Sequence, residues 1–277
     1  MREEAIATCL GALHVEISGT GPAVVCWPSL MLTGSMWSEQ AARLCHKFTF
    51  VVIDPPGHGR SSPLSRSFTM EECALCVKQV LDALALPDCV LFGTSWGGMV
   101  GGAFAALYPE RTRGAVLLNT TASGATAFAK IACRLSAALG HKLGRIPAFM
   151  LPAVGRVFVG PTTGRTKPHV VASIRASLAR VNMTSVAWAL RSVVGDRRDQ
   201  HALLGTVRRP VLVVAGDEDR EFSVAEGRGM AAAIPGSQFQ SLSHVGHSSV
   251  LEAPDRVHAV LSDFLSELPC HKWTQSS

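Results

Sequence analysis

Charged residues are scarce in this sequence of 277 residues. They make up only 17% of it, whereas hydrophobic residues make up 47%. A chain this apolar can bury enough surface to offset the entropy lost on ordering, which excludes intrinsic disorder. Gly and Pro occur in ordinary amounts, 25 and 15 residues, which excludes collagen-like and low-complexity chains. The length is about twice that of a ~150-residue domain and favours one large α/β domain or a domain with an insertion.

Clustered cysteines are also absent. The eight cysteines are scattered through apolar segments, and Cys73 and Cys76 form the one close pair. This spacing excludes a small disulfide-stapled scaffold, and we expect reduced thiols in a cytoplasmic protein. Without a second pair or a histidine at ligand spacing, Cys73 and Cys76 predict the buried stripe of a helix in place of a zinc site.

No segment is typical of a membrane-spanning helix or a signal peptide. Residues 17–38 and 89–109 carry no charge over about a bilayer's thickness, but Gly and Pro interrupt both stretches. Buried strands, turns and helices explain them better. The first twenty residues lack a basic start followed by a long apolar centre, so no signal peptide is expected. The sequence therefore predicts no transmembrane segment.

Acidic residues are missing from one long segment. Between Arg111 and Gly195 there is no Asp or Glu but there are twelve Lys or Arg, which leaves 14 basic and 21 acidic residues elsewhere. Such a change in composition indicates an inserted subdomain. A solvated helical surface would explain the charge, and so would a field that attracts an anionic substrate or an anionic surface. Nucleic acid is not expected as a partner, because the segment has too few closely spaced aromatic rings for stacking.

Short apolar runs alternate with helical patterns through most of the chain. The expected strands are 13–17, 23–27, 48–53, 89–92, 115–118, 211–215 and 239–242. One expected helix begins at Thr69, with Glu72 at capping-box spacing. Other expected helices cover 99–107, 223–234 and 254–265. This alternation predicts an α/β fold with a mostly parallel sheet covered by helices on both faces. Residues 122–205 interrupt it and predict a basic helical cap inserted between core segments 1–121 and 206–277.

A G-x-S-x-G pentapeptide, residues 93–97, directly follows one expected strand and precedes a helical pattern. Alone the motif is weak, but the order strand, motif, helix is typical of a nucleophile elbow. Such an elbow presents the serine hydroxyl, here that of Ser95, at the carboxyl edge of the sheet. Glycines flank the serine because a side chain there would collide with neighbouring backbone in so tight a turn.

A nucleophilic serine needs a base, and the base needs an orienting carboxylate. In this type of fold the three follow in the order Ser, acid, His. Asp217, Glu218 and Asp219 follow the strand at 211–215, and His244 and His247 follow the last strand. Position and order predict a Ser–Asp–His triad but leave open which carboxylate and which histidine belong to it.

The sequence resembles the α/β-hydrolase superfamily along nearly its whole length outside the cap. Within that superfamily it resembles hydrolases of the 3-oxoadipate enol-lactonase type. The blocks that carry the resemblance are Ser29-Leu30 upstream of Trp37, Asp54-x-x-Gly57-His58-Gly59-x-Ser61, Gly93-x-Ser95-x-Gly97-Gly98-Met99-Val100-Gly101, Pro109-Glu110-Arg111, Leu118-Asn119-Thr120, Gly216-x-x-Asp219 and Gly246-His247-x-x-x-x-Glu252-x-Pro254. The resemblance implies Ser95 as nucleophile, Asp219 as acid and His247 as base.

The resemblance also implies an oxyanion hole formed by two backbone N–H groups. One belongs to Trp96, which follows the nucleophile. The second comes from the loop after residues 23–27, where Pro28-Ser29-Leu30 replaces the superfamily's usual His-Gly-x. Enol-lactonases also carry Ser at the second position, so Leu30 is expected to be the donor. The block around His58 is expected to be a structural turn.

The sequence therefore predicts a serine hydrolase that cleaves a carboxylic ester or lactone through an acyl-enzyme, without a metal or organic cofactor. A small anionic enol-lactone would suit both the resemblance and the basic cap. Two other reactions of such a triad stay open: hydrolysis of an activated C–C bond and a cofactor-free, haloperoxidase-like perhydrolase reaction. The fold can also serve as a small-molecule receptor. Haloalkane dehalogenases and epoxide hydrolases are not expected, because they carry Asp at the position of Ser95.

Overall fold

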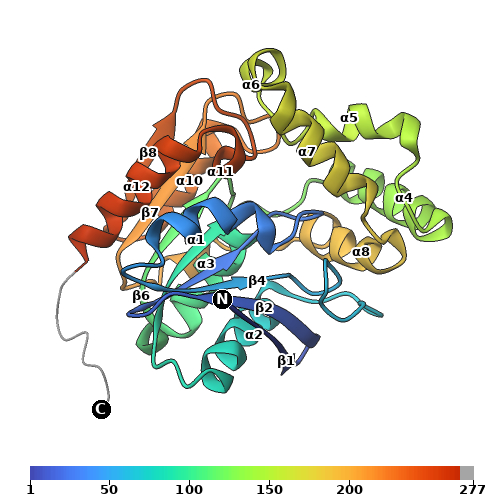
Figure 1. The fold of residues 1–277 in the computed structure, drawn as a ribbon. Helices are drawn as coiled ribbons and strands as arrows, with labels where there is room; N and C mark the ends of the chain where they lie inside the picture. Colours follow the sequence, from blue (N-terminus) through green and yellow to red (C-terminus); the bar gives the residue numbers. More distant parts are fainter. Residues whose placement is uncertain (269–277) are drawn as a thin grey trace.

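The computed structural model of the chain describes residues 1–268 (Figure 1). Its centre is an eight-stranded sheet in the order β1-β2-β4-β3-β5-β6-β7-β8. Strand β2 is antiparallel to β1 and to β4, and all other neighbours are parallel, which confirms the predicted mostly parallel sheet. The strands are β1 (Arg2–Thr8), β2 (Gly11–Ser18), β3 (Ala23–Trp27), β4 (Thr49–Ile53), β5 (Cys89–Thr94), β6 (Thr112–Leu118), β7 (Val211–Gly216) and β8 (Gln238–Leu242).

The seven predicted strands are all present, and β1 is an addition to them. Strands β3, β5 and β7 are buried along their whole length, as expected for apolar runs in the middle of a parallel sheet. Strand β1 was not predicted because Arg2, Glu3 and Glu4 make its sequence polar. It forms the edge of the sheet and exposes most of these side chains, so polar residues are tolerated there.

Helices surround the sheet and form a separate group between β6 and β7. They are α1 (Ser38–Leu44), α2 (Met70–Ala83), α3 (Trp96–Leu107), α4 (Ala127–Leu143), α5 (Leu151–Gly155), α6 (Pro161–Thr166), α7 (Pro168–Ala179), α8 (Met183–Leu190), α9 (His201–Leu204), α10 (Val224–Ala233), α11 (Ser249–Glu252) and α12 (Pro254–Glu267). Short 3₁₀ segments are η1 (Gly34–Trp37), η2 (Pro109–Arg111) and η3 (Ala148–Met150), and η4 (Arg191–Gly195) is a π-helical turn. Within the described residues, no helix is long and apolar enough to cross a bilayer.

The two faces of the sheet are covered by different helices. Successive side chains of a strand point to opposite faces. In β6, Leu117 lies against Gly101 of α3, whereas a side chain at Gly114 would meet Phe264 of α12 at 3.0 Å. Helices α3 and α12 therefore cover opposite faces, as predicted.

Helix α2 begins at the predicted capping box. The Thr69 hydroxyl accepts the N–H of Glu72 at 3.3 Å, and the Glu72 carboxylate accepts the N–H of Thr69 at 2.9 Å. Cys73 and Cys76 are buried on the apolar side of this helix, as their spacing predicted. The described cysteines are free thiols, and Cys270 lies outside the described residues.

Residues 127–195, which we call the helical insertion, contain α4 to α8 and η4. These elements contact one another, α4 with α8 and η4, and α7 with α5 and α6. Figure 1 shows them gathered on one side of the sheet. Their place between β6 and β7 follows the change in composition, because this is the part of the chain without Asp or Glu.

Candidate active site

Ser95 occupies a sharp turn between β5 and α3. Its backbone has φ 57° and ψ −112°, a conformation that is strained for a residue with a side chain and that is typically found at functional sites. A Cβ atom at Gly93 would lie 2.0 Å from the carbonyl oxygen of Gly97, and one at Gly97 would lie 2.1 Å from that of Trp27. Both flanking positions therefore require glycine, for the steric reason that the motif suggested.

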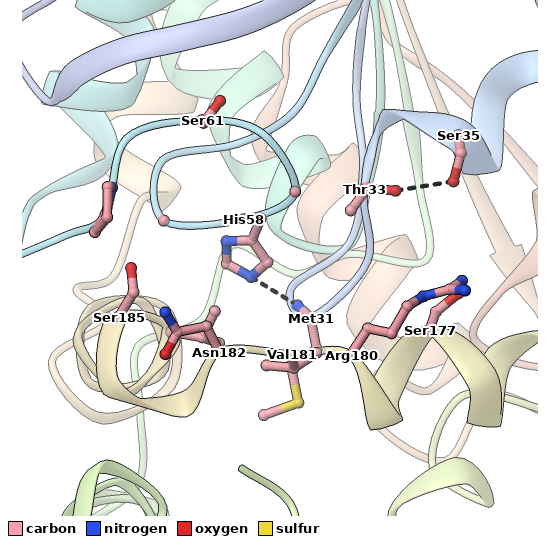
Figure 2. Close-up of a pocket in the computed structure, with 14 residues that line it drawn as sticks. Met31, Thr33, Ser35, His58, Ser61, Ser177, Arg180, Val181, Asn182 and Ser185 are labelled. Atoms are coloured by element: carbon pink, nitrogen blue, oxygen red, sulfur yellow. Dashed lines mark hydrogen bonds between the residues drawn. The ribbon is translucent and has the colours of Figure 1, made fainter. Parts of the chain in front are cut away.

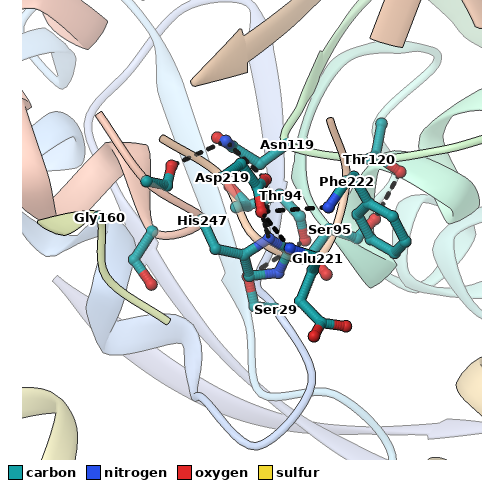
Figure 3. Close-up of polar contacts among 12 residues, drawn as sticks. Ser29, Thr94, Ser95, Asn119, Thr120, Gly160, Asp219, Glu221, Phe222 and His247 are labelled. Atoms are coloured by element: carbon teal, nitrogen blue, oxygen red, sulfur yellow. Dashed lines mark hydrogen bonds and ion pairs between the residues drawn. The ribbon is translucent and has the colours of Figure 1, made fainter. Parts of the chain in front are cut away.

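His247 and Asp219 form a buried pair beside this turn (Figure 3). The Nδ1 atom of His247 lies 2.9 and 3.0 Å from the two carboxylate oxygens of Asp219. The side chain of His247 is 4% exposed and that of Asp219 fully buried. An Nδ1–H that donates to the carboxylate leaves the Nε2 lone pair free to accept a proton.

The other candidate acids and base make different contacts. Glu218 accepts the N–H of Thr162 at 2.7 Å and the hydroxyl of the same residue at 2.6 Å. His244 has a side chain that is 75% exposed, and its Nδ1 lies 3.8 Å from Glu218. The side chain of Asp217 is exposed. Of the alternatives that the sequence left open, the structure brings only Asp219 and His247 together in the interior.

Three further groups hold the carboxylate of Asp219 in place. Its Oδ1 accepts the N–H groups of Glu221 and Phe222 at 2.8 and 3.1 Å. Its Oδ2 accepts the side-chain amide of Asn119 at 3.1 Å, and the same amide donates to the carbonyl of Gly246 at 2.9 Å. Asn119 thus connects the acid to the loop that carries His247, a role that the sequence analysis did not assign. The sequence signal that could have indicated this role is the position of Asn119 directly after β6.

Glu252 is a second buried carboxylate without an assigned role in the sequence analysis. It is 1% exposed and accepts three backbone N–H groups. Two come from Gly246 and Ser248, which flank His247, each at 3.0 Å, and the third comes from Gly160 of the helical insertion at 2.9 Å. Hydrogen bonds to a charged acceptor are stronger than neutral ones. Glu252 therefore ties the His247 loop to the helical insertion.

The two predicted oxyanion donors lie at the same site. In the described part of the chain, the N–H groups of Leu30 and Trp96 have no protein acceptor. Leu30 and Ser95 line one cavity, and Trp96 is the first residue of α3, where helical N–H groups are unpaired. No hydrogen bond joins the Ser95 hydroxyl to His247 among the described residues. Catalytic hydrogen bonds of this kind often tighten only when substrate binds.

His58 supports the loop that carries Leu30 (Figure 2). Its Nε2 accepts the N–H of Met31 at 3.0 Å, and its Nδ1 lies 2.9 Å from the carbonyl of Pro56. Burial lowers the pKa of His58 from 6.5 to about 4, so the ring is neutral at pH 7. The tautomer protonated at Nδ1 satisfies both contacts. These contacts agree with the structural turn expected for this block and add an anchoring contact to the neighbouring loop.

The cavity at Ser95 is small and mainly apolar, with a volume of about 160 Å³. Ser95, His247, Arg197 and Glu221 are its polar lining residues, and the others are Leu30, Met31, Met99, Val154, Val157, Phe158, Leu190, Val193, Val194 and Phe222. None of the twelve basic residues of segment 111–195 lines it. A larger cavity of about 350 Å³ lies on the His58 side and is lined by neither Ser95 nor His247 (Figure 2).

A group with metal-ligand chemistry lies elsewhere in the described residues. It consists of Glu3, His14 and Glu16 on β1 and β2. Arg60 already pairs with both of these carboxylates. None of the three residues lines the Ser95 cavity.

Comparison with known proteins gives consistent matches over most of the chain. A family model described as the α/β hydrolase fold matches residues 22–254. The 3-oxoadipate enol-lactonase 2 of Acinetobacter baylyi is 30% identical over 86% of this chain and 87% of its own length. Among solved structures, a thermophilic esterase from Thermogutta terrifontis has a TM-score of 0.89 and 30% identity, and the match covers 97% of this chain and 99% of the esterase. The enol-lactonase from Burkholderia xenovorans has a TM-score of 0.86 and 27% identity, with 95% and 100% covered.

Proposed function

This chain belongs to the α/β-hydrolase fold family, and from that premise we propose that it is a serine hydrolase that cleaves a carboxylic ester or lactone. Ser95 is the nucleophile, His247 the base and Asp219 the orienting acid. One observation carries the proposal: His247, which is paired with the buried Asp219, lines the same cavity as a serine held in a strained turn. Similarity to enol-lactonases and an esterase favours the same class of reaction.

The reaction proceeds by acyl transfer to water. His247 takes the proton from Ser95 as the serine oxygen attacks the carbonyl carbon, and Asp219 stabilises the imidazolium that forms. The N–H groups of Trp96 and Leu30 bind the developing oxyanion, each contributing on the order of 3 kcal/mol in comparable sites. His247 then returns the proton to the leaving oxygen. In the second half, His247 activates a water that releases the acyl group from Ser95.

The helical insertion acts as a cap over Ser95 and His247. It forms the main part of segment 122–205, which is inserted between core segments 1–121 and 206–277. Val154, Val157 and Leu190 of the insertion line the Ser95 cavity together with residues of the core. A cap that contributes apolar side chains excludes water from the acyl group and strengthens the electrostatic interactions around it. Glu252 supports this arrangement because it binds the insertion and the His247 loop at once.

The lining of the cavity favours a small substrate with an apolar acyl part. Arg197 is the one cation among the lining residues, and its guanidinium lies 5.3 Å from the ring centre of Phe222. A carboxylate on an enol-lactone would meet Arg197. The basic residues of the insertion line no part of this cavity, so their charge would act on an anionic substrate only from a distance.

Labelling with a fluorophosphonate and hydrolysis of a short-chain nitrophenyl ester test the proposal together. Both should be present in the wild type and lost in Ser95→Ala. Ser266→Ala is the matched control, because this serine is exposed on α12 and lies outside the cavity. Absence of both signals in folded wild-type protein would contradict the proposal and favour the receptor function. Labelling of Ser95 without ester turnover, but with cleavage of a C–C bond or with formation of a peracid from a carboxylic acid and hydrogen peroxide, would favour the other triad reactions.

A further inference from the structure

Large hydrophobic side chains are exposed mainly in one place on this protein. Of the nine that are exposed in the described residues, seven lie between residues 128 and 150. We call these seven the apolar stripe: Phe128, Ile131, Leu135, Leu139 and Leu143 of α4, followed by Phe149 and Met150 of η3. They are between 36% and 84% exposed. A contiguous apolar surface of this kind marks an interaction site.

The sequence of α4 places the stripe on one side of the helix. Its five members on α4 follow one another at intervals of three or four residues, which is the spacing of a single helical face. The buried residues of α4 are instead the small residues Cys133, Ala137 and Gly140. They allow close packing against α8 and η4. The large apolar residues are therefore turned away from the protein, the reverse of an ordinary surface helix.

Basic side chains are exposed along the same segment, and Lys142 and Arg145 border the stripe itself. Lys130, Arg134 and Lys142 of α4 are exposed, as is Arg145 just beyond it. Within residues 1–268, the one acidic group paired with them is Asp196, 3.9 Å from Arg134. Because no Asp or Glu occurs between residues 111 and 195, pairing of this segment with that of a second copy would bring two positively charged surfaces together. An anionic surface complements both features.

We propose that the apolar stripe docks the protein on an anionic lipid bilayer, lying in the interface with its apolar side chains inserted. An amphipathic helix with Phe and Leu on one face and Lys and Arg at its sides binds such interfaces. Anionic lipids attract the basic side chains, and burial of the apolar ones anchors the helix. Docking of this kind requires no membrane-spanning helix.

A second cavity connects the stripe to the interior. It has a volume of about 160 Å³ and is lined by Leu139, Leu143 and Met150 of the stripe. Met31, Val154 and Leu190 line this cavity and also the Ser95 cavity. The docked face therefore borders an apolar route toward Ser95, suited to an ester that is dissolved in the bilayer. This last step rests on the proposed function, whereas docking itself does not.

Co-sedimentation with vesicles tests the proposal. Vesicles of phosphatidylcholine with one third phosphatidylglycerol should bind the wild type, and pure phosphatidylcholine vesicles should bind it far more weakly. Raising the salt concentration from about 0.1 M to about 0.5 M should reduce binding, because screening weakens attraction to the lipid charge. Ser95→Ala should bind as well as the wild type, so loss of activity and loss of docking can be told apart.

Paired variants separate the apolar and the basic contributions. Phe128→Ser with Leu135→Ser should weaken binding more than tenfold, because each side chain loses its burial in the interface. Lys142→Gln with Arg145→Gln should weaken it about 25-fold, at about fivefold for each basic residue. The matched controls Leu107→Ser and Arg208→Gln with Arg209→Gln, exposed on the core, should bind like the wild type.

Three outcomes would overturn the proposal. The first is no binding to anionic vesicles by the folded protein. The second is binding that the stripe variants do not change. The third is a dimer in light scattering that Phe128→Ser with Leu135→Ser converts to a monomer, without vesicle binding, which would make a second copy the occupant of the stripe.

Discussion

The neutral, buried ring of His58 makes the stability of this protein depend on pH in a specific window. The folded protein holds the pKa of His58 at about 4, against 6.5 for a solvated histidine. As the pH falls below 6.5, the unfolded chain binds a proton that the folded protein does not bind. Stability is therefore present above pH 6.5 and is lost as the pH falls toward 4.

The size of this loss follows from the two pKa values. Each pH unit between them corresponds to about 1.4 kcal/mol, so the loss approaches about 3 kcal/mol at about pH 4. His58→Gln removes the titrating group, while the Gln amide can still accept the N–H of Met31 and donate to Pro56. The variant should therefore lose about 3 kcal/mol less than the wild type between about pH 7 and about pH 4.

Urea unfolding followed by tryptophan fluorescence at several pH values measures this difference. His244→Gln is the control, because that side chain is 75% exposed. The difference between His58→Gln and the wild type should open between pH 6.5 and 4, and the control should follow the wild type. Parallel curves for His58→Gln and the wild type would refute the reasoning, because they would mean that His58 titrates alike in the folded and unfolded states.

Three further substitutions test the site. Glu252→Gln should destabilise the protein by about 2–4 kcal/mol in urea unfolding, because a buried carboxylate that accepts three N–H groups loses its charge. The decrease in kcat should be larger than the change in KM. An unchanged kcat would remove the positioning role. Gly93→Ala should yield no folded protein, since its Cβ would lie 2.0 Å from a backbone oxygen, whereas Gly229→Ala on α10 meets nothing within 4 Å and should fold normally; circular dichroism distinguishes the two. Asp219→Asn should lower kcat about 10⁴-fold by favouring the wrong tautomer of the histidine, and Asp217→Asn should not. Equal losses in initial-rate assays would contradict the choice of acid.

The elbow at Ser95 was predictable from the sequence because its causes are local. A strand, two glycines and a helix occur within nineteen residues, and the collision that requires Gly93 lies within that turn, whereas the one that requires Gly97 is with Trp27 of the neighbouring strand β3. The capping box at Thr69 is local in the same way. The buried strands were also predictable, because strands covered on both faces are continuously apolar.

The choice among Asp217, Glu218 and Asp219 was not predictable from spacing, because three adjacent carboxylates satisfy the same order along the chain. Contacts from distant segments separate them in the structure. Glu218 is bound by Thr162, which lies 56 residues earlier, and Asp219 by Asn119, which lies 100 residues earlier. Such pairings depend on how the chain packs and leave no local signal.

The role of the basic segment also depends on packing. Its charge suggested an attraction for an anionic substrate or an anionic surface, and sequence alone could not say which. The cavity at Ser95 contains none of its Lys or Arg residues, whereas Lys142 and Arg145 lie beside an exposed apolar face. The hydrophobic pattern alone would place the large apolar side chains of α4 inward. In the structure the small residues of α4 pack against α8, and the large apolar side chains point outward.

The central claim is that Ser95 carries the acyl group during turnover. Rapid acid quenching of the wild type with excess nitrophenyl ester, followed by peptide mass spectrometry, measures this directly. We predict an acyl mass increase on the peptide that contains Ser95, formed with a burst of nitrophenol and absent in Ser95→Ala. Ester turnover at a normal rate with no acyl group on Ser95 would contradict the claim.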